Sequence, residues 1–91
     1  IDTAGTVSEA ARALKNLGAN DIYVCATHAL FSGPAVERLT AAPITEVVIT
    51  DSINLAPERR FPTLHVLSVG ELLAKAIRFT HADQSVSVLF E

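Results

Sequence analysis

The residues best suited to chemistry stand at the start of the chain, in the run Asp2-Thr3-Ala4-Gly5-Thr6. The threonines offer hydroxyl donors, and Gly5 permits a tight turn and a close approach of the backbone to a ligand. The spacing of the apolar residues that follow predicts a helix, whose first N–H groups are unpaired and carry the positive end of the helix dipole. Such a loop suits a phosphate group. The carboxylate of Asp2 would repel phosphate, but it can accept hydrogen bonds from sugar hydroxyls beside it.

The same run also allows a purely structural interpretation, in which the loop only turns and caps the helix. Thr6 and Glu9 match the T-x-x-E capping box, which makes Thr6 the expected N-cap. Apolar residues then recur at helical spacing as far as Leu17, and Gly18 supplies the expected C-terminal stop. Residue types and spacing alone leave phosphate binding and capping both open.

The rest of the chain predicts three strands and two more helices around one sheet. A second capping box, Ser68 with Glu71, precedes the last helix, whose apolar side is formed by leucine, alanine and isoleucine residues. The strands are expected at Ile22–Ala26, Val47–Thr50 and Leu64–Leu67, the helices at Gly33–Ala41 and after Ser68, and the apolar side at Leu72, Leu73, Ala76 and Ile77. The order α-β-α-β-β-α is typical of an α/β fold with a largely parallel sheet.

Polar residues follow each of the predicted strands. In open α/β sheets, ligands bind beyond the carboxyl ends of the strands, where Asp2–Thr6, Thr27-His28 and Asp51-Ser52 are expected. His28 has no cysteine or carboxylate spaced beside it, so a structural role is favoured for it, as for His65 and His81. Asp51 is favoured as a turn residue, and Arg59-Arg60 as part of a solvated loop.

Composition excludes several classes of protein. The net charge of -3 and the pI near 5.5 argue against nucleic-acid binding. No apolar run reaches the roughly 18 residues that a transmembrane helix needs. The single Cys25 cannot form an internal disulfide, is expected to be buried in its strand, and fits a reducing, cytoplasmic compartment.

The chain is expected to be part of a larger domain. Hydrophobic residues make up 49% of it and the mean hydropathy is +0.36, which is high for 91 residues that form a small monomer. A loop such as Asp2–Thr6 normally follows a strand, and no strand precedes it here. We therefore interpret residues 1–91 as a partial domain, with at least one strand edge or face left without its neighbour.

Four segments carry a resemblance to known proteins. Ile1-Asp2-Thr3-Ala4-Gly5-Thr6 resembles the end of the phosphoribosyl pyrophosphate motif of type I phosphoribosyltransferases. ATHALFSGPAVERL, from Ala26 to Leu39, and EVVITDSI, from Glu46 to Ile53, look like segments of ribose-phosphate pyrophosphokinases. The closing SVGELLAKAIRFTHADQSVSVLF is similar to the last helix and tail of the same family. The match is in order and runs over essentially the whole chain.

The resemblance implies a type I phosphoribosyltransferase-like, Rossmann-like α/β domain, of which this chain would be the C-terminal portion. The family transfers the diphosphoryl group of ATP to ribose 5-phosphate with Mg²⁺, commonly as a cytoplasmic hexamer. The 5-phosphate site then falls on Asp2, Thr3, Ala4, Gly5 and Thr6. The catalytic loop, the metal ligands and most of the ATP site would lie outside this chain, so the chain alone is expected to be inactive.

The tail carries a second expectation from the resemblance. In the family this tail helps to form a regulatory site for phosphate or ADP between subunits, which would involve Ser85, Ser87 and Phe90. A tail that only packs against its neighbours is the alternative. Two further functions stay open for the chain: a non-catalytic regulatory relative of the synthetase, and part of a salvage phosphoribosyltransferase.

Overall fold

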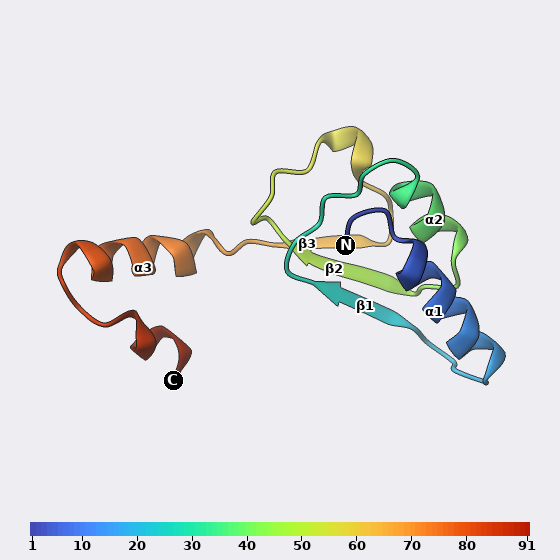
Figure 1. Cartoon of the computed structure of the whole chain (residues 1–91), viewed down its shortest axis with the longest axis horizontal. Coiled ribbons are helices and arrows are strands. Elements are labelled where there is room, and N and C mark those ends of the chain that lie inside the picture. Colours follow the sequence, from blue (N-terminus) through green and yellow to red (C-terminus); the bar gives the residue numbers. More distant parts are fainter.

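The three strands form one parallel sheet with the order β1-β2-β3, as the sequence predicted. The computed structural model describes residues 1–91 (Figure 1). Its helices are α1 (Gly5–Asn16), α2 (Ala35–Ala41) and α3 (Gly70–His81), with short 3-10 helices η1 (Pro57–Arg59) and η2 (Val86–Phe90). Its strands are β1 (Tyr23–Ala26), β2 (Glu46–Thr50) and β3 (Leu64–Leu67).

The main core lies on one face of the sheet. Val47 and Ile49 of β2 are fully buried there, because alternate residues of a strand point to the same face. They pack in one cluster with Leu39 of α2 and with Phe31, whose ring lies 5.9 Å from that of Phe61 at a tilt of 45°. Ala4, beside the start of α1, belongs to the same cluster. The core therefore joins the central strand to the predicted phosphate loop.

The opposite face of the sheet is open. Tyr23 and Leu67 are each 60% exposed, and Cys25 is exposed as well. Cys25 pairs in register with Val48, which pairs with His65, so one row of side chains crosses this face. The prediction that Cys25 is buried, in a strand covered on both faces, is therefore wrong. Residue composition suggested burial, but no element of this chain covers that face.

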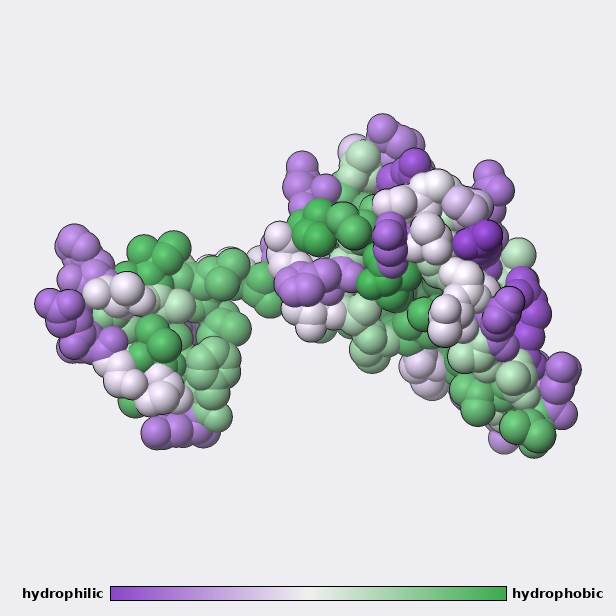
Figure 2. Space-filling view, viewed as in Figure 1, coloured by the Kyte–Doolittle hydropathy of each residue, from purple (hydrophilic) through white to green (hydrophobic).

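The region from α3 onward leaves the sheet (Figure 1). Neither α3 nor η2 contains a buried residue, and the chain extends over 51 × 29 × 19 Å as a result. The predicted helix and its apolar side are present, but that side does not pack on the sheet. Figure 2 shows hydrophobic residues gathered on this part of the surface, and those that are exposed are Leu72, Leu73, Ile77, Val86, Val88 and Phe90.

Both predicted capping boxes are wrong. The N-cap of α1 is Ala4 rather than Thr6, and no side chain caps the helix. The N-cap of α3 is Val69, while the hydroxyl of Ser68 accepts a hydrogen bond from the N–H of Gly70 at 3.1 Å. Glu71 instead forms an ion pair with Lys75 at 3.1 Å. A left-handed Ala4 starts α1 earlier than the T-x-x-E pattern indicates, which places Thr6 inside the first turn.

The predicted end of α1 is confirmed. Gly18 has a φ of 101° and follows the C-cap Leu17. Its N–H donates to the carbonyl of Lys15, and the N–H of Ala19 donates to the carbonyl of Leu14, both at 3.1 Å. These two bonds form a Schellman motif, in which glycine avoids the cost of a left-handed conformation.

None of the helices combines the length and the apolar composition that a membrane crossing requires.

Candidate functional site

The loop before α1 has the backbone geometry of an anion-binding nest. Ala4 is left-handed, with φ 63° and ψ 13°, and Gly5 is the first helical residue. A left-handed residue followed by a right-handed one turns successive N–H groups toward a common point, which favours an anion. Residues 1–7 line a hollow of about 250 Å³ around this loop. A left-handed conformation is uncommon for a residue other than glycine and concentrates at functional sites.

The N–H groups at this point are free. The first backbone bond of the helix runs from the N–H of Ser8 to the carbonyl of Ala4 at 3.0 Å, and no intramolecular hydrogen bond uses the N–H groups of residues 4–7. The side chains of Asp2, Thr3 and Thr6 are exposed around them. The structure thus brings together all five residues predicted for a phosphate site, Asp2, Thr3, Ala4, Gly5 and Thr6. No ligand or measurement tests their role.

Backbone pairing fixes the loop to the segment after β1. The backbone nitrogen of Ile1 donates to the carbonyl of His28 at 2.8 Å, and the N–H of Leu30 donates to the carbonyl of Ile1 at 2.9 Å. The N–H of Ser32 donates to the carbonyl of Asp2 at 2.9 Å. Between them, Phe31 is fully buried although its φ is 51°. The core therefore holds a strained segment that in turn positions the start of the loop.

A second contact reaches the loop from α2. The Nη1 atom of Arg38 donates to the carbonyl of Thr3 at 3.1 Å. A Cβ atom added to Gly5 would lie 3.3 Å from the same nitrogen, so the absence of a side chain at Gly5 makes room for the guanidinium. Sequence reasoning did not find Arg38, because nothing in the residue pattern signals a contact between positions 35 residues apart.

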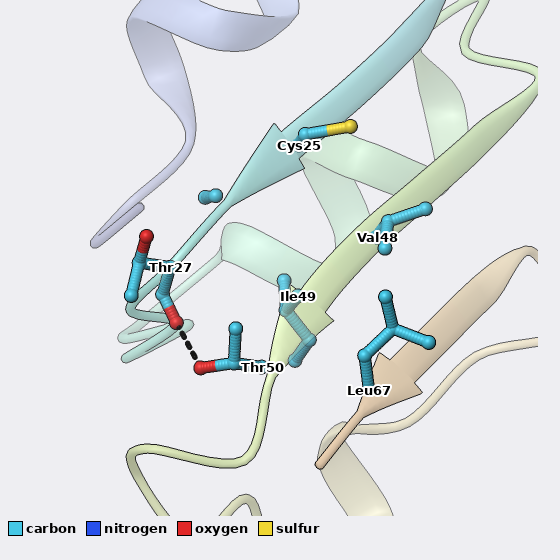
Figure 3. Close-up of a pocket in the computed structure, with 7 residues that line it drawn as sticks. Cys25, Thr27, Val48, Ile49, Thr50 and Leu67 are labelled. Carbon is cyan, nitrogen blue, oxygen red and sulfur yellow. Dashed lines mark hydrogen bonds between the residues drawn. The ribbon is translucent and has the colours of Figure 1, made fainter. Parts of the chain in front are cut away.

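A polar network joins the carboxyl ends of β1 and β2. The hydroxyl of Thr50 donates to the carbonyl of Thr27 at 2.6 Å, the bond drawn in Figure 3. The hydroxyl of Ser52 lies 3.1 Å from the same carbonyl and 2.8 Å from Nδ1 of His28. Two of the three polar segments expected at this edge therefore contact each other directly. Backbone pairing through Ile1 links the third, the Asp2–Thr6 loop, to His28.

The carboxylate of Asp51 helps to hold the junction between the sheet and α3. Its Oδ1 accepts a hydrogen bond from the N–H of Val69 at 2.8 Å. That bond, with a smaller contribution from the hydroxyl of Ser68, lowers the pKa of Asp51 below its ordinary value. Asp51 lies at a bend, but its carboxylate bonds a residue 18 positions away rather than its own turn, so the predicted turn role stays a prediction. Arg59 departs from its prediction, because its Nη1 donates to the carbonyl of Gly33 at 2.9 Å and the residue is half-buried rather than simply solvated.

A larger hollow of about 380 Å³ lies on the open face of the sheet. Figure 3 shows Cys25, Val48 and Leu67 projecting there from the three strands. Its lining is mostly apolar and includes no helix N-terminus with unpaired N–H groups, so it suits an anion less well than the hollow beside Gly5. The structure contains no cluster of three or more metal-ligating side chains. Mg²⁺ is usually held by one or two carboxylates together with waters and substrate phosphates; Asp2 offers a single carboxylate, and we assign no step to a metal held by this chain.

Two of the three tail residues, Ser85 and Ser87, contact each other, and none of the three is buried. The N–H of Ser87 donates to the hydroxyl of Ser85 at 3.3 Å, and the two hydroxyls are 2.7 Å apart. Phe90 is 75% exposed at the end of η2. Ser87 and Phe90 therefore lie on the 3-10 helix η2, and Ser85 is its N-cap. No contact in the structure tests the regulatory role predicted for these residues.

Comparison with known proteins gives one consistent result. The family model for the phosphoribosyl synthetase-associated domain matches residues 1–91. Ribose-phosphate pyrophosphokinase of Gloeobacter violaceus is 53% identical over 90 residues, which cover 99% of this chain and 27% of that protein. The enzyme of Bacillus subtilis is 52% identical over 90 residues, with 28% of its length covered.

A solved structure agrees with these relatives. The crystal structure of phosphoribosylpyrophosphate synthetase from Mycobacterium smegmatis superposes with a TM-score of 0.89 at 40% identity, over 91% of this chain and 28% of that one. The fold class predicted from the sequence is therefore confirmed. The chain spans little more than a quarter of the length of these relatives. Because the family model matches every residue, the chain belongs to the phosphoribosyl synthetase-associated domain family.

Proposed function

We propose that this chain is the C-terminal quarter of a ribose-phosphate pyrophosphokinase and that its Asp2–Thr6 loop binds the 5-phosphate of ribose 5-phosphate. The observation that carries the proposal is the left-handed Ala4 followed by helical Gly5, which directs unpaired N–H groups to one point. The hydroxyls of Thr3 and Thr6 add donors for the phosphate oxygens. Asp2 accepts hydrogen bonds from the ribose hydroxyls.

In the proposed reaction, the anomeric hydroxyl oxygen of ribose 5-phosphate attacks the β-phosphorus of ATP. The bond between that phosphorus and the oxygen bridging to the α-phosphorus breaks, so AMP leaves and the hydroxyl proton is released. Phosphoryl-type transfer depends mainly on positioning and charge stabilisation. The role of this chain is to hold one reactant at its phosphate end, which fixes the anomeric carbon in place.

The remaining components of the reaction lie outside this chain in the proposal. Residues elsewhere in the polypeptide hold ATP and Mg²⁺, which stabilises the charge of the transferred phosphates when bound. The active protein is a cytoplasmic homo-oligomer, with a hexamer as the expected state, and the 91 residues alone are inactive. The tail residues Ser85, Ser87 and Phe90 contribute to a site for phosphate or ADP between subunits.

The test is an assay of the complete polypeptide that carries this chain. Ribose 5-phosphate, ATP and Mg²⁺ are expected to give phosphoribosyl pyrophosphate and AMP in equal amounts. Binding of ribose 5-phosphate without turnover would identify a regulatory relative instead. Formation of a nucleotide from a nucleobase and phosphoribosyl pyrophosphate would identify a salvage phosphoribosyltransferase.

A further inference from the structure

Arg38 is a cation beside the phosphate loop that the proposed function does not use. Its Nη1 donates to the carbonyl of Thr3 at 3.1 Å from the exposed side of α2. No ion pair joins Arg38 to a carboxylate, since the two ion pairs in the structure involve other residues. The hydrogen bond to the carbonyl of Thr3 is thus the polar contact that the structure shows for this guanidinium.

The contact fixes the orientation of one peptide plane. In a trans peptide, the carbonyl of one residue and the N–H of the next point in opposite directions, and the chain contains no cis bond. When Arg38 holds the carbonyl of Thr3, the N–H of Ala4 must therefore point away from Arg38. That N–H is the first of the three N–H groups that a left-handed Ala4 and a helical Gly5 bring together.

We infer that Arg38 is a positioning residue for the ribose 5-phosphate loop: it holds the Thr3–Ala4 peptide in the orientation that directs the N–H of Ala4 at the phosphate. The inference rests on the proposed function of the loop. Arg38 acts through the peptide and does not contact the phosphate. Gly5 serves the same arrangement, because a Cβ atom there would lie 3.3 Å from Nη1 of Arg38 and crowd the guanidinium.

The test uses the complete polypeptide with Arg38→Ala, Arg38→Lys and a matched control. Arg38→Ala is expected to raise the KM for ribose 5-phosphate on the order of ten-fold, as for the loss of a charge-assisted hydrogen bond. The kcat and the KM for ATP should stay within about two-fold. Arg38→Lys keeps a charged donor and should recover most of the loss. Arg12→Ala removes an exposed arginine of α1 that makes no ion pair and should change nothing.

Hydrogen exchange separates this inference from the proposed function. Amide exchange at Ser8 and Ser32, whose N–H groups donate to the carbonyls of Ala4 and Asp2, should be several-fold faster in Arg38→Ala than in the parent in the absence of substrate, because the loop that carries both acceptors loses its brace. If the parent does not use ribose 5-phosphate, the proposed function fails, and exchange still decides whether Arg38 holds the loop. Unchanged exchange, an unchanged KM for ribose 5-phosphate, or equal losses in kcat and both KM values would each overturn the role of Arg38.

Discussion

Two helices of this chain have the same length but opposite surroundings. α1 and α3 each contain 12 residues with an apolar side. α1 buries Ser8 and Ala11, whereas α3 buries nothing. α1 is fixed at both ends, by backbone pairing of Ile1 and Asp2 and by the turn at Gly18. α3 is joined to the sheet only at its start. Apolar spacing thus identifies the side of a helix that packs, while the partner depends on the rest of the fold.

The largest expected effect contrasts the cores of the two regions. Leu39→Ala should lower the free energy of unfolding by about 2–5 kcal/mol, because Leu39 is almost fully buried. Leu73→Ala, the matched change in α3, should cost less than about 1 kcal/mol because Leu73 is 52% exposed. Urea unfolding of the 91-residue chain, in sucrose to strengthen folding, measures both. Equal losses would show that α3 packs against something in solution.

The next expected effect concerns binding at the start of α1. Thr6→Ala in the complete polypeptide should weaken ribose 5-phosphate binding by about 1.5–3 kcal/mol, the range for a hydrogen bond to a charged group. Thermal stability should not change, because Ala4 and not Thr6 is the N-cap. Calorimetric titration and thermal unfolding measure the two quantities. Unchanged affinity would remove Thr6 from the phosphate site, and a lower Tm would restore a capping role.

A smaller effect is expected from the tail. Truncation after Asp83 in the complete polypeptide should reduce inhibition by ADP or activation by phosphate at least about five-fold, the lower end of typical allosteric coupling. Turnover without effectors should fall much less. Ser85→Ala with Ser87→Ala keeps the apolar residues of η2 that pack beside α3 and removes only the two hydroxyls, so it should reproduce part of the loss of effector response. A normal effector response after truncation would remove the tail from the regulatory site.

The smallest expected effect concerns the junction between the two regions and its pH dependence. The folded pKa of Asp51 is below its ordinary value of 3.8, so its carboxylate stabilises the fold above that pH and the contribution is lost as the pH falls through the folded pKa. Asp51→Asn should therefore be slightly less stable than the parent at pH 7 and indistinguishable from it in strong acid. Thermal unfolding at both pH values measures this. A constant difference between the proteins would show that the carboxylate is not involved.

The sequence predicted the elements of the sheet region well. Strand β3 lies at Leu64–Leu67 as expected, and Gly18 ends α1, because short apolar runs and a left-handed glycine act over a few residues. The resemblance, rather than spacing, favoured the Asp2–Thr6 loop as a site over a turn.

The errors share a physical cause. Thr6 and Ser68 do not cap their helices, because the conformation of the preceding residues sets where each helix begins. Cys25 lies in a run with the composition of a buried strand, but its exposure depends on whether another segment covers the sheet. Arg38 reaches Thr3 through the packing of α2 beside α1, a relation that no local pattern encodes.

Chemical labelling can report whether the open face of the sheet is covered. Cys25 is the only cysteine of the chain, and it lies exposed on that face, on the edge strand β1 beside Val48. A thiol reagent therefore reports directly on whether the face is covered. Rapid labelling in the 91-residue chain and slow labelling of the same thiol in the complete polypeptide would measure, without any mutation, how much of this surface the rest of the protein shields.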